Sequence, residues 1–441
     1  MSTQSPSGAT STDSLSAPER RRSGTMRTGI AIAIAVILLI VGIGAGYAIG
    51  YSLKGSSSSS GSSSNPIQLT ETGSSLLYPL FNSYWFPNYT AIGQNVILSA
   101  ASTGSGAGQS SAENALVNIG ASDAYLANAS ATNLINFPVA ISSQLIYYNL
   151  PAPLNGVHLN LNGTIMALIY EGDITTWNNP TLEAAQSPTV AAELSAMSSQ
   201  TIYPVKRTDS SGDTFIFTSY CSAAWSGFPY PVSTSGLSGD NIPNMQTGTG
   251  NAGVVSTLGK QAGSIGYVGI SYTSSASAAG LQYAALGDNL TVVNGQYASA
   301  AADYILPSAQ NISYDANLGL QRLDFGTYGL AVSLILGGSY LGAITLTHGG
   351  GGTNPTATSP DPYPIVNLEY TLFKTAPVSG SNVVTATTLA ATVAFMHWAL
   401  STGNYGTNGQ SPSAWISAVG FVPLTPEVIG YDLQELATVS Y

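Results

Sequence analysis

Charged side chains are scarce in this 441-residue sequence, at 7% of all residues against about 25% in an average soluble protein. Basic residues are the rarest of them, and the formal net charge is −11. After Lys54 the chain has only five basic residues, which are Lys206, Arg207, Lys260, Arg322 and Lys374. Nucleic-acid binding requires a basic surface, so this class of function is excluded.

Cysteine is limited to Cys221, so the chain cannot form an internal disulfide. We expect this residue to be small, buried and helical, because free cysteines are usually buried. Histidine is limited to His158, His348 and His397, which lie far apart and lack the spacing of metal ligands. The sequence therefore predicts no metal site and no cofactor.

Uncharged polar residues must form most of the surface, because 44% of the residues are hydrophobic and few are charged. A surface of Ser, Thr, Asn, Gln, Tyr and Gly does not depend on ionised groups, which favours an acidic exterior. A composition typical of the lineage is the alternative explanation. The length predicts roughly two or three domains.

One long apolar run lies near the N-terminus. Residues 29–51 contain no charge and are long enough to cross a bilayer as a helix, and the Ser/Thr-rich tail 1–28 before them carries four arginines. The arginines predict a single-pass anchor with the N-terminus inside and the rest of the chain outside the cell membrane. A cleaved signal peptide is the alternative, although its apolar region is usually only about 7–15 residues. Residues 52–65 are rich in Ser and Gly, which predicts a disordered linker to an extracellular domain.

Five N-x-S/T sequons follow in that extracellular part, and they are consistent with a glycoprotein, although sequons also occur by chance. They are Asn88, Asn128, Asn162, Asn289 and Asn311. From about residue 67, β-type runs such as 96–100 and 264–270 alternate with helical patterns such as 110–118 and 388–400. This alternation predicts an α/β fold with a mostly parallel sheet.

Three segments combine glycine with small hydroxyl residues just before a helical pattern. They are T-E-T-G-S-S-L-L-Y-P-L (70–80), A-S-T-G-S-G-A-G-Q (101–109) and R-T-D-S-S-G-D-T-F (207–215). Each segment alone is explained by ordinary helix capping. Together they suggest an anion site, because helix N-termini offer free N–H groups and strand ends meet at one edge of an α/β sheet.

The order and wording of these segments resemble the phosphate-binding proteins of ABC importers, the PstS type. The resemblance is carried by T-G-S-S-L-L-Y-P-L-F, S-T-G-S-G-A-G, N-I-G-A-S-D-A-Y-L, Y-E-G-D-I-T-T-W-N-N-P, K-R-T-D-S-S-G-D-T-F-I-F-T-S-Y, G-S-I-G-Y-V-G-I-S-Y, Y-P-I-V-N-L-E-Y and A-F-M-H-W-A-L-S-T-G-N. It covers most of the chain from about Leu69 to Pro426.

The resemblance implies a two-lobed, periplasmic-binding-protein-like (type II) fold that closes on phosphate and passes it to ABC permease subunits. Lobe one would combine residues 66–148 with 368–441, and lobe two would hold residues 149–367. Two hinge crossings are expected, near Tyr147–Leu150 and near Asn367–Tyr370. The implied phosphate-binding residues are Ser75, Leu76 (through its backbone), Ser105, Asp123, Arg207, Ser211, Gly212 and Asp213. Asp209 is expected to orient Arg207 by an ion pair.

The resemblance places Asp123 beside the ligand, and this implies a protonated phosphate, because two negative charges repel each other. Asp123 accepts a hydrogen bond from a P–OH group, which fully ionised sulfate lacks. Many family members have threonine where this chain has Asp213. Either Asp213 is a second acceptor that favours the phosphate monoanion, or its side chain turns away and caps its own helix.

Other functions stay open at this point. Within the binding class, the ligand could be sulfate, molybdate or arsenate. An extracellular phosphatase would need a nucleophile with a base or clustered metal ligands, and neither is visible, so the sequence predicts that the protein is not an enzyme. A surface structural protein is the third possibility.

Overall fold

The computed structural model describes residues 65–441 except 128, 198–200, 238–241, 288–291, 294–295, 298–303, 321–362 and 402–409. All described residues belong to one structural unit, residues 62–441. The predicted tail (1–28), the transmembrane segment (29–51) and nearly all of the linker (52–65) lie outside the described residues. Among the helices that are described, none combines the length and the hydropathy needed to span a bilayer.

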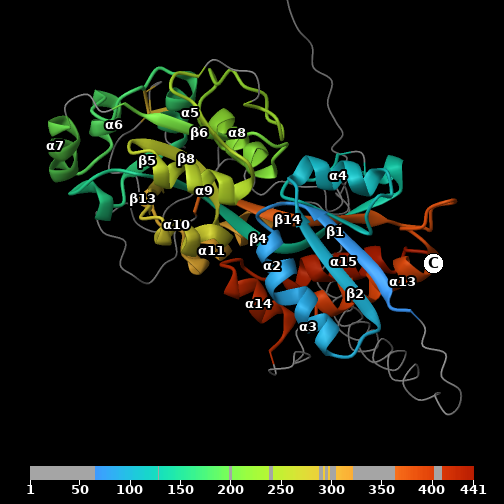
Figure 1. The fold of residues 1–441 in the computed structure, drawn as a ribbon. Helices are drawn as coiled ribbons and strands as arrows, with labels where there is room; N and C mark the ends of the chain where they lie inside the picture. Colours follow the sequence, from blue (N-terminus) through green and yellow to red (C-terminus); the bar gives the residue numbers. More distant parts are fainter. Residues whose placement is uncertain are drawn as a thin grey trace, which may run out of the picture. The chain divides into compact units, whose positions relative to one another are not determined.

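A nine-stranded sheet runs through the described unit in the order β2-β1-β3-β14-β4-β8-β6-β7, with β9 paired to β4 (Figure 1). Its strands are β1 (Ile67–Gly73), β2 (Val96–Ser102), β3 (Ile119–Ser122), β4 (Leu134–Tyr148), β6 (Tyr203–Arg207), β7 (Gln246–Gly248), β8 (Ser264–Gly269), β9 (Gln282–Tyr283) and β14 (Val366–Lys374). The strands β1, β2 and β3 are parallel to one another, and so are β6, β7 and β8. The expected parallel pairing is thus present in each half, whereas β4 and β14 run antiparallel to their neighbours.

Strand β4 joins the two halves of the sheet, which correspond to two lobes. It pairs with β14 from Leu134 to Ser143 and with β8 from Gln144 to Tyr148, and all of its residues are buried. The change of partner therefore lies between Ser143 and Gln144, a few residues before the crossing expected at Tyr147–Leu150. Polar side chains occupy this point of an otherwise apolar buried strand, which places hydrogen-bonding groups between the lobes.

Helices cover the sheet in each lobe, and several begin at residues suited to that position. The helices of lobe one are α2 (Tyr78–Leu80), α3 (Phe86–Ala91), α4 (Ser105–Glu113), α13 (Ala386–Ala399), α14 (Pro412–Ala418) and α15 (Pro426–Leu436). Those of lobe two are α5 (Gly163–Glu171), α6 (Pro180–Ala184), α7 (Pro188–Ala196), α8 (Gly212–Ala224), α9 (Gly250–Lys260), α10 (Thr273–Ala278) and α11 (Ala309–Leu320). Four of them, α6, α7, α14 and α15, start at proline, which needs no hydrogen-bond donor in the first turn.

Contacts assign the helices to particular strands. Helix α4 packs on β1, β3 and β14, while α13 packs on β1 and α15 on β4, and α9 packs on β6, β7 and β8 (Figure 1). Two short sheets complete lobe two, one of β5 (Asn160–Asn162), β10 (Ala285–Gly287) and β13 (Tyr304–Ile305), and one of β11 (Val292–Val293) and β12 (Gln296–Tyr297). The helices α4, α8 and α9 all start directly after a strand of the main sheet, which brings their N-termini to its strand ends.

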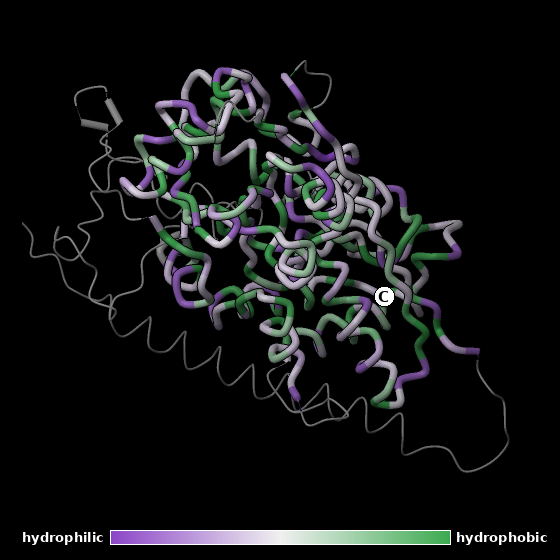
Figure 2. Tube along the Cα trace, turned by 60° about the vertical axis from the view of Figure 1, so that its left-hand side comes forward, coloured by the Kyte–Doolittle hydropathy of each residue, from purple (hydrophilic) through white to green (hydrophobic). Residues whose placement is uncertain are grey.

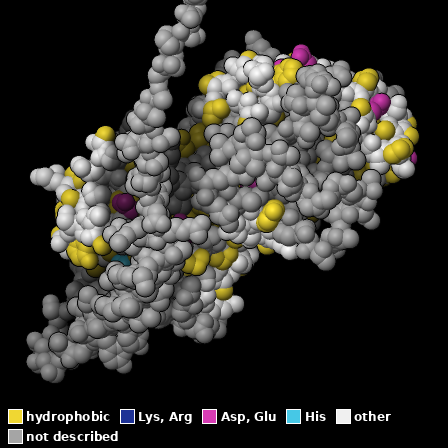
Figure 3. All heavy atoms as spheres, turned by 180° about the vertical axis from the view of Figure 1, so that it is seen from behind, with side chains coloured by type: hydrophobic (Ala, Val, Ile, Leu, Met, Phe, Trp, Pro, Cys, Tyr) yellow, Lys and Arg dark blue, Asp and Glu magenta, His cyan; other side chains and the backbone are white. Residues whose placement is uncertain are grey.

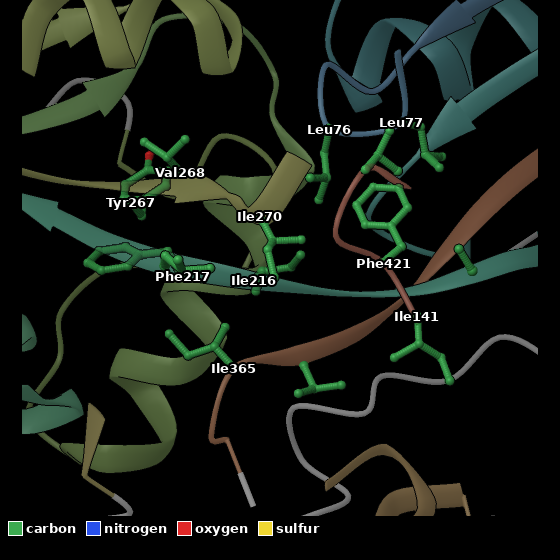
Figure 4. Close-up of a cluster of buried hydrophobic side chains, with 14 of the residues drawn as sticks. Leu76, Leu77, Ile141, Ile216, Phe217, Tyr267, Val268, Ile270, Ile365 and Phe421 are labelled. Atoms are coloured by element: carbon green, nitrogen blue, oxygen red, sulfur yellow. The ribbon is translucent and has the colours of Figure 1, made fainter. Parts of the chain in front are cut away.

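One hydrophobic core extends through both lobes. Figure 4 shows Leu76 of lobe one near Ile270 of lobe two, with Ile216 of lobe two and Ile141 of β4 in the same cluster. The contact at Leu76 is tight, because a Cβ at Gly269 would lie 2.2 Å from Leu76 Cδ1. Figure 2 shows hydrophobic stretches in the interior of the described part of the chain, and the face in Figure 3 has few charged side chains among the described residues. Cys221 is buried on α8, as expected.

Candidate anion-binding site

Two of the three Gly/Ser segments meet across the lobes. The segment before α4 follows β2, and the segment before α8 follows β6. The N–H of Gly106 donates to the carbonyl oxygen of Ser210 at 2.9 Å, which joins the two segments directly. The remaining segment, residues 70–80, is tied to the segment before α4, because the N–H of Gly104 donates to the carbonyl oxygen of Gly73 at 2.8 Å. All three predicted segments therefore lie together at the ends of parallel strands.

Arg207 is the last residue of β6, and its side chain is only 1% exposed. Its Nε donates to Asp209 Oδ1 at 2.8 Å and its Nη2 donates to Asp209 Oδ2, while its Nη1 donates to Asp213 Oδ2 at 2.7 Å. Burial alone would lower the pKa of Arg207, but the hydrogen bonds and charges of the two aspartates raise it above the usual value. The guanidinium is therefore a permanent buried cation, oriented by Asp209 as the sequence predicts.

Asp213 points into the site and is fully buried. Its carboxylate accepts hydrogen bonds from Arg207, from Asn251 Nδ2 at 2.7 Å and from Gln144 Nε2 at 3.2 Å. The alternative in which Asp213 caps α8 is wrong, because the side chain of Ser211 accepts from the N–H of Thr214 and caps that helix instead. Burial raises the pKa of Asp213 against the opposing charge of Arg207.

Asp123 follows β3 and is 1% exposed. The hydroxyls of Ser74 and Ser105 donate to its two carboxylate oxygens, the latter at 3.2 Å. Burial first, and then repulsion by Asp213, raise the pKa of Asp123 to about 6. Hydrogen bonds from Glu369 and Ser74 and the charge of Arg207 act in the opposite direction. Asp123 and Arg207 thus lie within electrostatic reach of each other in one buried cluster.

Gly212 lies where the two lobes are in close contact. A Cβ at this position would lie 2.5 Å from Ser105 Oγ and 2.6 Å from the Cβ of Asp123, so no larger residue fits. The N–H groups of Gly212 and Asp213 stand in the first turn of α8, where they have no partner inside the helix. Together with the first turn of α4 they supply the positive ends of two helix dipoles.

Two predicted donors of the first segment have protein partners here. The N–H of Leu76 donates to Ser74 Oγ at 3.0 Å. The Oγ of Ser75 accepts from the backbone N–H and from Nδ2 of Asn251, at 3.1 and 3.0 Å. Ser75 and Asn251 come from opposite lobes, so this contact connects them in the arrangement seen here.

Four residues of the cluster were not predicted from the sequence, namely Ser74, Gln144, Asn251 and Glu369. Asn251 had a detectable signal, because T-G-T-G-N (247–251) repeats the pattern of glycine and hydroxyl residues before a helix. Its side chain also accepts from the N–H of Gly269 at 2.9 Å. Gln144 and Glu369 lie within buried strands, far from any glycine-rich turn, so no local pattern marks them.

The cluster is unlike a metal site. Its carboxylates surround a guanidinium and accept hydrogen bonds from hydroxyl and amide groups, and no group of His, Cys, Asp and Glu suited to a metal ion occurs in the part of the chain that the structure describes. A small cavity borders Arg207 and is lined by hydroxyl residues including Thr208, Ser210 and Thr234. The arrangement can therefore hold a small anion with hydrogen-bond donors and acceptors, without a metal.

Comparison with known proteins agrees with this chemistry. The profile of the PBP superfamily domain matches residues 58–401. The phosphate-binding protein PstS of Pasteurella multocida is 30% identical over 260 residues, which cover 57% of this chain and 69% of that protein. The PstS of Xylella fastidiosa is 30% identical over 255 residues, or 57% of this chain and 63% of that protein.

Among solved structures, the phosphate-binding protein of Stenotrophomonas maltophilia shares the fold, with a TM-score of 0.53 at 19% identity over 84% of this chain and 93% of that one. The relatives are binding proteins rather than enzymes. The chain therefore belongs to the PBP superfamily and, within it, to the family of PstS-type phosphate-binding proteins.

Proposed function

We propose that this protein binds inorganic phosphate between its two lobes and delivers it to the membrane subunits of an ABC-type importer. The observation that carries the proposal is the buried cluster in which Arg207, Asp123 and two helix N-termini come together. The family membership supports the same ligand, because the relatives are named for phosphate binding.

Each group has a part in this proposal. Arg207 and the N–H groups of Gly212 and Asp213 supply positive charge and donors to phosphate oxygens. Ser75, Ser105, Ser211 and the backbone of Leu76 supply further donors once the ligand replaces partners in their present hydrogen bonds. Asp123 accepts the hydrogen bond of a P–OH group. Sulfate has no such proton, so its oxygens would face the Asp123 carboxylate with no hydrogen bond between them, at a cost of about 1–3 kcal/mol or more.

Asp213 adds a further negative charge to the site, which disfavours a doubly charged ligand. The three aspartates of the cluster already face one guanidinium, so a ligand with two negative charges would meet strong repulsion. The phosphate monoanion carries one charge and two P–OH groups, which match the two acceptors Asp123 and Asp213. We therefore propose that this site prefers the monoanion, in keeping with an acidic exterior.

Calorimetric titration of the purified full-length chain with phosphate, sulfate, molybdate and arsenate tests the assignment. We expect tight one-to-one binding of phosphate without turnover and no measurable binding of sulfate. Arg207→Ala and Asp123→Asn are the matched variants, since each removes one sign of charge from the cluster. Tight sulfate binding, or phosphate binding that neither variant weakens, would contradict the proposal.

The location is a separate proposal that rests on sequence alone. Residues 29–51 would anchor the protein in the cell membrane with the N-terminus inside, and residues 52–65 would tether the binding domain outside. Asn88, Asn162 and Asn311 are glycan acceptors in this arrangement. Protease digestion of intact cells should remove the binding domain and leave the tail protected, and mass spectrometry should find any glycans.

A further inference from the structure

A third carboxyl group, Glu369, lies beside Asp123 in the site. It stands on β14, where Tyr370 is paired with Ser122 of β3, so the antiparallel register carries Glu369 towards Asp123. The same stretch of β14 contacts Asp123 directly, because Asn367 Nδ2 donates to the carbonyl oxygen of Asp123 at 2.5 Å. Glu369 is 0% exposed, and no aspect of the proposed phosphate chemistry uses it so far.

The two oxygens of Glu369 have different surroundings. The hydroxyl of Ser142 on β4 donates to Oε1, whereas Oε2 is buried and receives no hydrogen bond from an N–H or hydroxyl donor of the described residues. The carboxyl nevertheless approaches Asp123 closely enough for a hydrogen bond between them to shift the pKa of both.

The charged groups that face Glu369 are both acidic. Asp123 faces it from the end of β3 and Asp213 from α8, while Arg207 on β6 acts on the two aspartates and is itself paired with Asp209. Burial first, and then the charge of Asp123, raise the pKa of Glu369 well above its usual value. Among the groups named here, none of those facing Glu369 is a cation that would stabilise its ionised form.

We propose that Glu369 is a positioning residue of the phosphate site, which keeps its proton and donates it as a hydrogen bond from Oε2 to Asp123. This inference rests on the proposed function. The donated hydrogen bond stabilises the ionised form of Asp123, so that Asp123 stays an acceptor for the P–OH group at lower pH than it would alone. Glu369 therefore extends phosphate binding into acidic conditions.

The test compares the pH dependence of phosphate affinity in variants of the full-length chain. Glu369→Gln keeps a donor at the same place, whereas Glu369→Leu removes it at similar volume. Asp432→Asn is the matched control, because Asp432 on α15 is also fully buried and has no hydrogen-bond partner among the described residues, and the charge that acts on it is Glu435, which is outside the site. Affinity is measured by calorimetry from about pH 4 to about pH 8, which brackets the pKa of Asp123.

We expect the wild-type chain, Glu369→Gln and Asp432→Asn to lose affinity at the same pH, near the pKa of about 6 of Asp123. Glu369→Leu should lose it about one pH unit higher, which means about tenfold weaker binding below that point. An unshifted profile in Glu369→Leu, or a Glu369→Gln profile shifted as far as that of Glu369→Leu, would overturn the inference.

The protonation of Glu369 can also be tested on the wild-type chain, so that this test does not depend on the folding of a variant. In ¹³C NMR of carboxyl-labelled protein without phosphate, Glu369 should titrate well above the usual value of 4.5. Titration at or below that value would refute a protonated Glu369. This readout also separates the two proposals: absence of phosphate binding by the wild-type chain defeats the proposed function, whereas the NMR titration judges Glu369 alone.

Discussion

Two aspartates of one site, Asp209 and Asp123, are held in opposite ways. Asp209 belongs to the lobe-two wall and shares both its oxygens with the guanidinium of Arg207, which outweighs burial and lowers its pKa. Asp123 belongs to the lobe-one wall, where hydroxyls and a carboxyl surround it, and burial raises its pKa to about 6. Both carboxyls are buried, and the direction of the pKa shift depends on whether a guanidinium is hydrogen-bonded to the carboxyl.

The difference divides the site into a fixed wall and a pH-sensitive wall. The pair of Arg207 and Asp209 keeps its charges over the whole ordinary pH range. Asp123 changes its charge within the range in which phosphate itself exchanges a proton, so the acceptor and its ligand can respond to the same acidity. Selectivity for a protonated anion follows from the second wall, whereas attraction for any anion follows from the first.

The largest expected effect comes from removing the cation of the fixed wall. Arg207→Ala should weaken phosphate binding by more than about a hundredfold and lower the free energy of unfolding by about 3–5 kcal/mol, because Asp209 and Asp213 remain buried without an opposite charge. Calorimetry and urea denaturation measure the two effects. Arg207→Lys keeps the charge but cannot form two parallel hydrogen bonds. Its phosphate affinity and stability should lie between those of the wild-type chain and of Arg207→Ala. A fully stable Arg207→Ala protein would show that Asp209 and Asp213 do not depend on the guanidinium.

The next largest effect concerns the acceptor of the pH-sensitive wall. Asp123→Asn removes the charge but keeps the shape, and should weaken phosphate binding about 10–100-fold at neutral pH, the usual worth of a hydrogen bond to a charged group. The variant should also lose the decline of affinity below about pH 6. Parallel titrations with sulfate measure selectivity, which should become weaker. Unchanged discrimination against sulfate would assign selectivity to another residue.

Asp432 is a buried carboxyl outside the site, and it can be compared with Asp123. Burial raises its pKa well above 3.8, so the folded state holds the proton more tightly than the unfolded state. Its contribution to stability is complete below the unfolded pKa and is lost as the pH rises towards the folded pKa, by about 1.4 kcal/mol per pH unit. Burial also raises the pKa of Glu71 and of Glu369, so their contributions to stability are likewise lost as the pH rises. The protein should therefore be most stable in acid.

Denaturation in urea at about pH 4 and about pH 7 measures this slope. Asp432→Asn should show a smaller slope than the wild-type chain and should gain stability mainly at the higher pH. Equal slopes in the two proteins would mean that Asp432 titrates normally.

The smallest effect is expected at the residue that connects the two walls. Asp213→Thr replaces an acceptor by a hydroxyl donor and releases Nη1 of Arg207. Affinity for phosphate above neutral pH should rise by up to about tenfold, since repulsion of the dianion falls by one charge. Asp213→Asn serves as the control that keeps the shape. A loss of affinity at every pH would show that Asp213 contributes only through its ion pair.

Much of the site could be predicted because its residues follow glycine-rich turns. The motif S-S-G-D after β6 encodes a helix start capped by Ser211, and the spacing of two positions between Arg207 and Asp209 allows their ion pair locally. The α/β alternation and the burial of Cys221 on a helix were predictable for the same reason: period and capping are local properties. Asn251 could also have been predicted, because the turn before α9 repeats the pattern of glycine and hydroxyl residues.

The strand–turn–helix units, their glycines and the positions of Arg207 and Asp123 at strand ends and of Asp213 in the first turn of a helix follow from local sequence patterns. The inward direction of Asp213, the contact of Ser75 with Asn251 across the lobes, and the approach of Gln144 and Glu369 to the same cluster arise from long-range packing. The physical reason is that these contacts depend on where β4 and β14 cross between lobes. That register is set by the packing of both halves of the sheet around one core, and no local segment of the chain encodes it.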